Sequence, residues 1–232
     1  MEASGTFPDS RRSEEVTGPG LEVIGTTVGQ VAENSFTVFR EGSDRAVMID
    51  PGDEADRLMA PLAERGMTLE AILLTHCHFD HIGAVAPIAR ATGAPVYCPE
   101  IEVPILADVM TYVPWPGMGP FESWKAEETV SGGESLDLAG IGFEVIFTPG
   151  HSPGHVTYSV PEFGAVFSGD VLFQGSVGRV DLPGGDWAVL LESLKVLVEG
   201  HSPETTVYPG HMGMTTIGAE LETNPFLAQL EA

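Results

Sequence analysis

The sequence predicts an α/β protein, and three observations lead to this prediction. Short apolar runs bounded by glycine, proline or polar residues recur along the chain, as expected for strands. Segments with apolar residues at helical spacing, such as 53–65 and 186–198, separate some of these runs. A chain of 232 residues, 43% of them hydrophobic, can also fill a sizeable core. One α/β domain is the simplest architecture that accounts for all three observations.

The first half of the chain alternates between the two kinds of segment. Strands are expected where apolar and β-branched residues run together, at 21–27, 35–39, 46–49, 71–74 and 95–98. Helices are expected where apolar residues repeat every three or four positions or follow a turn, at 53–65, 82–91 and 100–110. Asp50-Pro51-Gly52 is typical of a tight turn between the third strand and the first helix.

The second half of the chain indicates a second group of strands followed by helices. Strands are expected at 134–138, 142–147, 155–160, 165–167 and 205–208. Helices are expected at 186–198, with Asp186 as its cap, and at 217–230, broken at Asn224-Pro225. Residues 1–18 mix serine, glycine, proline and charges without periodicity, so we predict a mobile tail there and a single domain over 19–232.

The segment 111–125 is rich in proline, glycine and aromatic residues. Its large apolar side chains are Tyr112, Trp115, Met118, Phe121 and Trp124. They offer more apolar surface than a plain connection needs, which favours a lid or a substrate wall. A long loop held to the body of the protein by its own aromatic side chains explains them equally well, and the sequence leaves both interpretations open.

The charge balance disfavours several classes of partner. Thirty-four acidic against ten basic residues give a formal net charge of −24, which repels polyanions and offers no basic groove for phosphates. No apolar run approaches the roughly 20 residues that cross a bilayer, and the start lacks the order of a signal peptide. We therefore expect a cytoplasmic protein that acts on a small molecule, without nucleic acid or membrane partners. The oligomeric state stays open.

A dense cluster of metal-ligand residues, Thr75-His76-Cys77-His78-Phe79-Asp80-His81, follows the apolar run at 71–74. Residues two apart in an extended segment project to the same side, so His76, His78 and Asp80 can converge on one point. His81 falls just beyond, free to serve a neighbouring ion. A single histidine is more often a satisfied polar residue, but three with an aspartate are hard to explain without a metal.

Cys77 and Cys98 are the chain's two cysteines, which are too few for a disulfide framework and are expected to be reduced. Alternation turns the side chain of Cys77 away from the neighbouring histidines, so packing rather than metal ligation is expected for it.

Three further apolar runs end in a ligand-type residue, at His151, Asp170 and His211, each preceded by glycine. Glycine or proline at such a point lets the backbone turn sharply and leaves space around a metal. With the first cluster this makes seven ligand-type side chains, which suits two ions sharing a carboxylate. We assign His76, His78 and His151 to one ion and Asp80, His81 and His211 to the other. Asp170 is assigned to both.

The order of these residues resembles the metallo-β-lactamase superfamily, whose hallmark is a T-H-x-H-x-D-H segment followed by a distant His, Asp and His. This resemblance implies a four-layer αβ/βα sandwich with metals at one edge, between two sheets. The segments 148–155, 168–173 and 178–181 are similar to the glyoxalase II branch, the hydroxyacylglutathione hydrolases. In a true metallo-β-lactamase a cysteine is expected at the position of Asp170. The branch implies a structural role for His155, and we expect Arg179 and Asp181 to form a local ion pair.

The resemblance implies a hydrolase of small acyl thioesters. Two divalent ions lower the pKa of water from about 15.7 to about 7, and the resulting hydroxide attacks the acyl carbon. Asp80 can orient that hydroxide or take its proton. Imidazole and carboxylate ligands suit zinc first, and iron or manganese next. Glyoxalase II continues into a helical segment that grips glutathione, whereas this chain ends about twenty residues after His211, so glutathione is not implied as the carrier thiol.

Other functions remain open. Persulfide dioxygenases resemble the chain in the same motifs but use one iron on the equivalents of His76, His151 and Asp170. A lactonase is a lesser alternative, because the same hydroxide attacks lactones. A metal-stabilised binding protein without catalysis predicts that His78→Ala alters stability while no ester, thioester or lactone is turned over. A ribonuclease is the least favoured, because the acidic composition leaves no RNA-binding surface.

Overall fold

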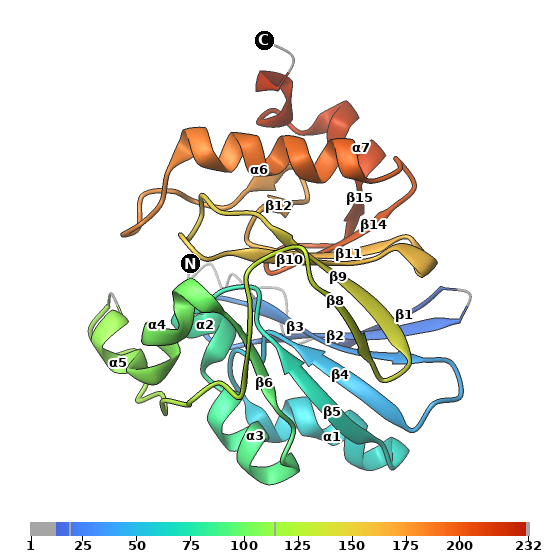
Figure 1. Ribbon diagram of the computed structural model, residues 1–232, viewed down its shortest axis with the longest axis vertical. Helices are drawn as coiled ribbons and strands as arrows, with labels where there is room; N and C mark the ends of the chain where they lie inside the picture. Colours follow the sequence, from blue (N-terminus) through green and yellow to red (C-terminus); the bar gives the residue numbers. More distant parts are fainter. Residues whose placement is uncertain (1–12, 19, 114, 231–232) are drawn as a thin grey trace, which may run out of the picture.

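The computed structural model describes residues 13–18, 20–113 and 115–230, and two large sheets pack face to face within it (Figure 1). Helices α1 (Ala55–Arg65) and α3 (Val85–Thr92) cover the outer face of the first sheet. Helix α6 (Trp187–Gly200) covers the outer face of the second. The four layers confirm the predicted αβ/βα sandwich.

The first sheet contains seven strands in sequence order. They are β1 (Ser13–Gly18), β2 (Leu21–Val28), β3 (Glu33–Arg40), β4 (Arg45–Ile49), β5 (Thr68–Leu73), β6 (Val96–Pro99) and β7 (Glu128–Val130). Neighbours from β1 to β4 are antiparallel, and those from β4 to β7 are parallel. Because β4 and β5 run in the same direction, their carboxyl ends meet at one edge of the sheet.

The second sheet contains six strands in the order β15-β14-β11-β10-β9-β8. They are β8 (Ser135–Leu138), β9 (Ile141–Phe147), β10 (Val156–Val160), β11 (Ala165–Gly169), β14 (Thr206–Pro209) and β15 (Thr215–Thr216). The pair β11–β14 is parallel, and the other neighbours are antiparallel. Strands β12 (Leu172–Phe173) and β13 (Ser176–Val177) form a separate hairpin. The parallel pair again brings two carboxyl ends to one edge.

The remaining helices are short. They are α2 (Phe79–Ile82), α4 (Val103–Ala107), α5 (Val109–Tyr112), α7 (Ile217–Thr223) and the 3₁₀ turns Glu100–Glu102, Pro161–Phe163 and Leu227–Gln229. Asp186 caps α6 as predicted, because its carboxylate accepts hydrogen bonds from the amides of Ala188 and Val189. No helix in the described part of the chain is long and apolar enough to cross a membrane.

Three apolar cores fill the three interfaces between the layers. The middle core lies between the sheets and contains Val38, Phe143, Tyr158 and Phe167, all buried. Alternation along each strand sends one set of side chains into this core and the other toward the helices. The Tyr158 hydroxyl donates to the Leu74 carbonyl at 2.9 Å and so joins the two sheets.

The structure differs from the predicted elements in several places. Residues 13–18, predicted to be part of a mobile tail, form β1, which pairs with β2 along six residue pairs; residues 1–12 of that tail lie outside the described residues. The predicted helix at 82–91 corresponds to α3, which begins three residues later, and α2 precedes it at the end of the cluster 75–81. Short strands β7, β12, β13 and β15 were not predicted. Pairing with a neighbour stabilises such short segments, and composition alone does not reveal it.

Replacing Phe143 by alanine is expected to lower the free energy of unfolding by about 3 to 5 kcal/mol, because the buried ring leaves a cavity between the sheets. Phe147 lies on the same strand but is 42% exposed, so Phe147→Ala is a matched control with an expected loss below about 1 kcal/mol. Denaturant titration of both variants measures the difference. Equal losses would contradict the assignment of Phe143 to the core.

Candidate metal centre

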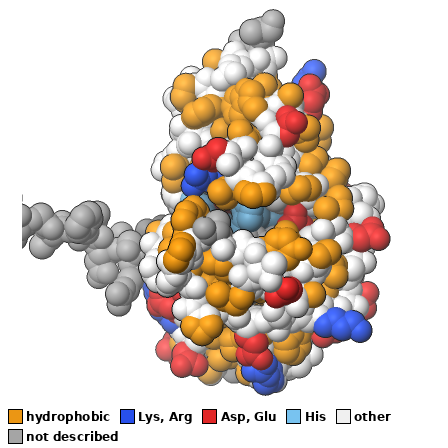
Figure 2. Space-filling model, turned by 90° about the vertical axis from the view of Figure 1, so that its left-hand side faces the viewer, with side chains coloured by type: hydrophobic (Ala, Val, Ile, Leu, Met, Phe, Trp, Pro, Cys, Tyr) orange, Lys and Arg blue, Asp and Glu red, His pale blue; other side chains and the backbone are white. Residues whose placement is uncertain are grey.

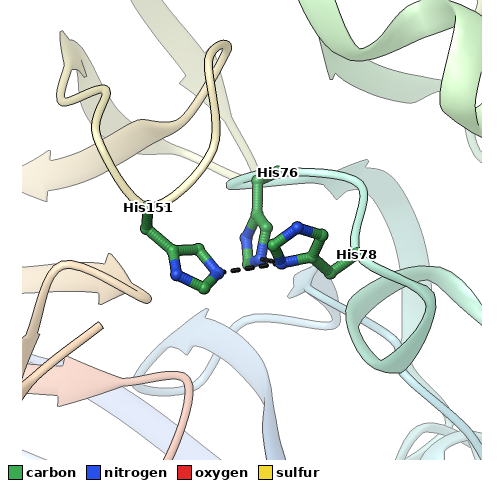
Figure 3. Close-up of side chains that lie close together, drawn as sticks. All are labelled: His76, His78 and His151. Carbon is green, nitrogen blue, oxygen red and sulfur yellow. Dashed lines mark hydrogen bonds between the residues drawn. The ribbon is translucent and has the colours of Figure 1, made fainter. Parts of the chain in front are cut away.

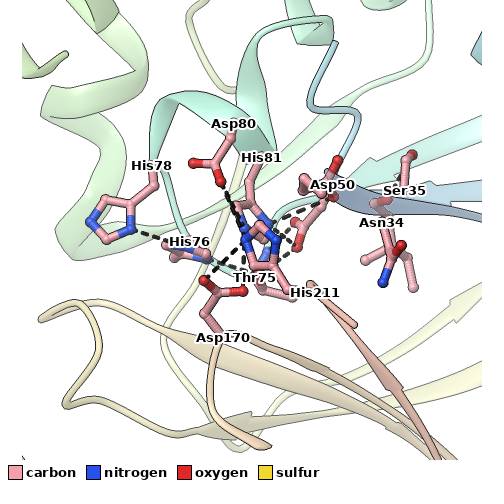
Figure 4. Close-up of polar contacts among 12 residues, drawn as sticks. Asn34, Ser35, Asp50, Thr75, His76, His78, Asp80, His81, Asp170 and His211 are labelled. Atoms are coloured by element: carbon pink, nitrogen blue, oxygen red, sulfur yellow. Dashed lines mark hydrogen bonds and ion pairs between the residues drawn. The ribbon is translucent and has the colours of Figure 1, made fainter. Parts of the chain in front are cut away.

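Four segments meet where the edges of the two sheets face each other (Figure 4). The cluster 75–81 follows β5 and continues into α2, and His151 lies in the connection between β9 and β10. Asp170 and His211 follow the parallel strands β11 and β14. Two backbone hydrogen bonds close the sheets against each other here, from Val156 to the Thr75 carbonyl at 2.8 Å and from Asn34 to the Gly210 carbonyl at 2.7 Å. The fold thus brings all seven predicted ligand residues together.

Three histidines converge on one point (Figure 3). His78 Nδ1 lies 3.1 Å from His76 Nε2 and 2.8 Å from His151 Nε2. His76 and His151 are buried, and His78 is half-buried. Three imidazole nitrogens at such distances form a ligand set suited to a divalent cation such as zinc. This is the set that the sequence assigned to the first ion.

Asp80, His81 and His211 form a second group beside the first. Asp80 Oδ2 lies 3.3 Å from His211 Nε2 and 3.9 Å from His81 Nε2. Asp170 lies between the groups: its Oδ1 is 3.3 Å from His81 Nε2, and its Oδ2 is 3.4 Å from His151 Nε2 and 3.6 Å from His211 Nε2. One carboxylate therefore contacts both groups, as expected of a shared ligand.

Hydrogen bonds on the outer side of the rings orient the nitrogens that face inward. His151 Nδ1 donates to the Arg179 carbonyl at 2.7 Å, His81 Nδ1 to Asp50 Oδ2 at 3.0 Å, and His211 Nδ1 to the Ala32 carbonyl at 3.3 Å. Because each acceptor requires a proton on Nδ1, the neutral form of each ring has its free lone pair on Nε2, which points into the site. The tautomers are those that metal binding needs.

Asp50 is a site residue that the sequence interpretation missed, because it was assigned to a turn. Its carboxylate accepts from the Thr75 amide at 2.7 Å and the Thr75 hydroxyl at 2.6 Å, besides His81. Since the Thr75 hydroxyl donates to Asp50, its oxygen accepts from His76 Nδ1 at 3.1 Å. Asp50 therefore orients two ligand histidines. Its position at the carboxyl end of β4, beside β5, was the available signal.

Glu102 was missed as well. This buried carboxylate accepts from the Ser152 hydroxyl and the Gly154 amide, both at 2.8 Å, and from the Cys77 amide at 3.4 Å. It joins the segment that carries His76 and His78 to the segment that carries His151. Nothing in the local sequence marks it, because its partners lie 25 to 52 positions away.

The pKa values of histidines in the two ligand groups are shifted in opposite directions. Burial, reinforced by the neighbouring imidazoles, lowers the pKa of His76 well below its usual value and that of His78 to about 4. Burial also opposes charge on His81 and His211, but Asp170 and the other carboxylate contacts outweigh it and raise the pKa of both. Without a metal, His76 and His78 of the first group are neutral at pH 7, whereas His81 and His211 of the second hold protons.

Asp170 stays ionised. Burial alone would raise its pKa, yet the charges of His81, His211 and His151 hold it well below its usual value. His81 Nε2 and Asp170 Oδ1 are both buried and make no well-formed hydrogen bond to any described residue. Buried polar atoms without partners are costly, and a cation between them satisfies both. The donor set and these two atoms fit a divalent metal.

The neighbouring residues behave as predicted. His155 is buried, donates from Nδ1 to the Thr148 hydroxyl at 3.0 Å and accepts from the Asp170 amide at Nε2, also at 3.0 Å, so it supports the segment of Asp170. Cys77 is a buried free thiol whose Sγ lies 3.5 Å from that of Cys98. Arg179 and Asp181 form the predicted ion pair, with two hydrogen bonds of 2.6 and 2.7 Å.

A cavity of about 540 Å³ opens above the ligands. Figure 2 shows histidine side chains at the bottom of an opening bordered largely by hydrophobic side chains. The segment 111–125 combines the two interpretations that the sequence left open, a substrate wall and a loop held to the body of the protein by its own aromatic side chains. Tyr112 and Trp115 line the cavity, whereas Phe121 and Trp124 pack against the core of the first sheet.

The family model of the metallo-β-lactamase superfamily matches residues 29–211, and the chain belongs to this superfamily. It is 38% identical over 205 residues to the probable metallo-hydrolase YqgX of Bacillus subtilis, covering 86% of this chain and 94% of that protein. It is 33% identical over 213 residues to the hydroxyacylglutathione hydrolase GloC of Haemophilus influenzae, covering 89% and 97%. The predicted relationship is confirmed, and the protein is a metallo-hydrolase of this superfamily.

Two solved structures are similar along most of their length. The B3 metallo-β-lactamase BLEG-1 is 39% identical with a TM-score of 0.83, covering 88% of this chain and 98% of that one. TTHA1623, solved in a di-iron-bound form, is 44% identical with a TM-score of 0.78, covering 88% and 99%. Both similarities support the fold.

Gly210 lies against the shared carboxylate, and an added methyl group would stand 2.4 Å from Asp170 Oδ1 and 2.7 Å from His81 Cε1. Gly210→Ala is therefore expected to weaken metal binding by about tenfold to a hundredfold. Gly200→Ala, where nothing lies within 4 Å, is the matched control. Titration with zinc against a chelator measures both, and circular dichroism checks the fold. Unchanged affinity in Gly210→Ala would contradict the close packing around Asp170.

The second group should bind metal more weakly as pH falls. A metal must displace the protons of His81 and His211, whose pKa values are raised, so each proton lowers apparent affinity about tenfold per pH unit below its pKa. His76 and His78 of the three-histidine group are neutral down to a much lower pH. Calorimetric titration of metal-free protein should show two equivalents at about pH 8.5 and one strong equivalent at about pH 6. Equal pH dependence of both equivalents would refute this.

Proposed function

We propose that this protein hydrolyses small acyl thioesters with two divalent ions in its site. The observation that carries the proposal is the pair of ligand groups that share Asp170 at the bottom of a cavity. Zinc is the first candidate, because imidazole and carboxylate ligands suit it, and iron and manganese follow. The di-iron form of TTHA1623 supports iron as an alternative. The similarity to GloC supports a thioester as the substrate.

His76, His78 and His151 would hold one ion, Asp80, His81 and His211 the other, and Asp170 would contact both. Ions held in this way supply a water of lowered pKa and polarise a bound carbonyl group. The remaining chemistry belongs to the side chains. Since burial is outweighed by the His211 hydrogen bond and the His81 charge, the pKa of Asp80 is lowered and its carboxylate stays ionised. Asp80 can therefore accept a hydrogen bond from the attacking water and orient it.

A thioester suits these side chains because its leaving group needs little protonation. A thiol has a pKa near 8.5, so the thiolate leaves readily near neutral pH. Asp80 and Asp170 both have lowered pKa values and can accept but not donate a proton. The cavity volume of about 540 Å³ and the net charge of −24 further support a small molecule, rather than a nucleic acid, as the partner.

The metal-loaded protein is expected to cleave acyl thioesters with two ions per chain, and Asp80→Asn should lower kcat by at least about a hundredfold. Asp137→Asn is the matched control, since Asp137 is an exposed aspartate on β8. Thiol release is followed after loading with zinc, iron or manganese, beside a lactone and a β-lactam.

The main alternative, a mono-iron persulfide dioxygenase, predicts different results in these assays. One iron per chain, oxygen uptake with a thiol persulfide and no thioester cleavage with any metal would replace the hydrolase proposal by the dioxygenase. No turnover of any compound, with altered stability in His78→Ala, would indicate a binding protein. Preferred cleavage of the lactone or the β-lactam would place the activity elsewhere among the hydrolases.

A further inference from the structure

The wall of the cavity differs in chemistry from its floor. The floor carries the metal-ligand side chains, whereas much of the remaining lining is apolar. Phe79, Tyr112 and Trp115, which we call the aromatic wall, line the cavity together with Phe173 and Val177 of the β12–β13 hairpin. A substrate in this cavity therefore meets apolar side chains beside the ligands.

The aromatic wall is ordered by its own packing. The Trp115 ring meets the Phe79 ring edge to face, with centroids 5.7 Å apart, and Phe79 packs on Phe121 from its other side at 5.6 Å. Phe79 lies between the ligand residues His78 and Asp80 in sequence, so the wall begins directly beside the metal centre.

Large apolar side chains also remain exposed around the mouth of the cavity. Tyr112 is 50% exposed, Trp115 39% and Met212 57%, and all three line the cavity. Exposed apolar groups gathered around one opening, as in Figure 2, indicate a surface that binds an apolar ligand.

The charged side chains of the lining also favour an uncharged ligand. Among the described residues that line the cavity, Arg179 is the one lysine or arginine, and its Nε and Nη2 both donate to the carboxylate of Asp181. The charge of Asp181 offsets that of the guanidinium and so weakens its attraction for a substrate carboxylate. The other charged groups of the lining include Asp80 and Asp170, which are candidate metal ligands and offer a substrate anion no positively charged side chain. Thr111 and Ser176 add only neutral hydroxyl groups.

We propose that the substrates are thioesters whose groups beside the reacting carbonyl are uncharged and apolar, such as arylacetyl esters of a neutral thiol, and that conjugates of the anionic thiol glutathione are disfavoured. This inference rests on the proposed thioester hydrolysis and names its substrate class. Trp115 and Tyr112 are the specificity-determining residues. The apolar group contacts their rings while the carbonyl carbon lies over the ligands.

Four substrates test the inference with metal-loaded protein. Phenylacetyl and lactoyl groups are each joined to N-acetylcysteamine, which is neutral, and to glutathione, which is anionic. The phenylacetyl ester of the neutral thiol should exceed lactoylglutathione in kcat/KM by at least about tenfold, because burial of one apolar group in a shaped pocket already supplies that discrimination. Uncleavable thioether analogues of the same four compounds, bound in a calorimeter, should rank in the same order.

Variants assign the preference to particular side chains. Trp115→Ala should lower kcat/KM for the phenylacetyl esters by about tenfold and leave the lactoyl esters and the metal content unchanged. Val196→Ala, at an exposed site on α6 outside the cavity lining, is the matched control. Asp181→Asn frees the Arg179 guanidinium and should raise kcat/KM for both glutathione esters about threefold at low salt, an increase that salt removes.

The outcomes separate this inference from the proposed function. Cleavage of all four esters with lactoylglutathione equal or preferred overturns the substrate class and leaves thioester hydrolysis standing. If the protein binds the thioether with the apolar group and the neutral thiol more tightly than the other three but cleaves no ester, the proposed ligand class stands and thioester hydrolysis is overturned. An equal loss on all four esters in Trp115→Ala shows that Trp115 does not determine specificity, and overturns its assignment.

Discussion

The gathering of five histidines and two aspartates in one space, four of them buried and three half-buried, is the constraint on which the rest of this structure depends. Removing such groups from water is costly unless each finds a partner. Asp170 meets most of this requirement, because its carboxylate lies within 3.3 to 3.6 Å of nitrogens on His81, His151 and His211. Two of the four buried side-chain atoms without a hydrogen bond among the described residues, His81 Nε2 and Asp170 Oδ1, face each other where a cation fits, and the other two are the carboxylate oxygens of Glu33.

This constraint explains why the groups that support the ligands are themselves buried and polar. Asp50 holds Thr75 and His81, and Glu102 joins the two segments that carry the first histidine group. Glu33 is buried beside His81, and burial together with the nearby carboxylates raises its pKa well above the usual value. Outer hydrogen bonds on His76, His81, His151 and His211 restrict the rotation of these four rings, which is what a preformed metal site requires.

Reactivity and selectivity come from different parts of the fold. The candidate ligands follow strands whose carboxyl ends meet at the edges of both sheets, and in the proposed function this arrangement would activate water. Apart from Phe79 of α2, the apolar cavity wall comes mainly from α5, the segment after it and the β12–β13 hairpin, which lie outside both large sheets. Such segments can change without disturbing the ligands, so one metal centre can serve many substrates across a superfamily.

Local sequence patterns were sufficient for the ligand set and for most of the larger strands and helices. His76, His78, Asp80 and His81 are close in sequence, and a glycine before each of His151, Asp170 and His211 marks a sharp turn. The spacing of apolar residues predicted most of the larger strands of both sheets, because burial of one face of a strand requires an apolar residue at every second position. What the sequence by itself determined is therefore the class of fold and the kind of chemistry. Only the tertiary structure decided which atoms orient the ligands and what the cavity accepts. Ala32 meets His211 across 179 positions and Glu102 meets Ser152 across 50, and contacts at such separations depend on how the sheets pack, which no local pattern encodes.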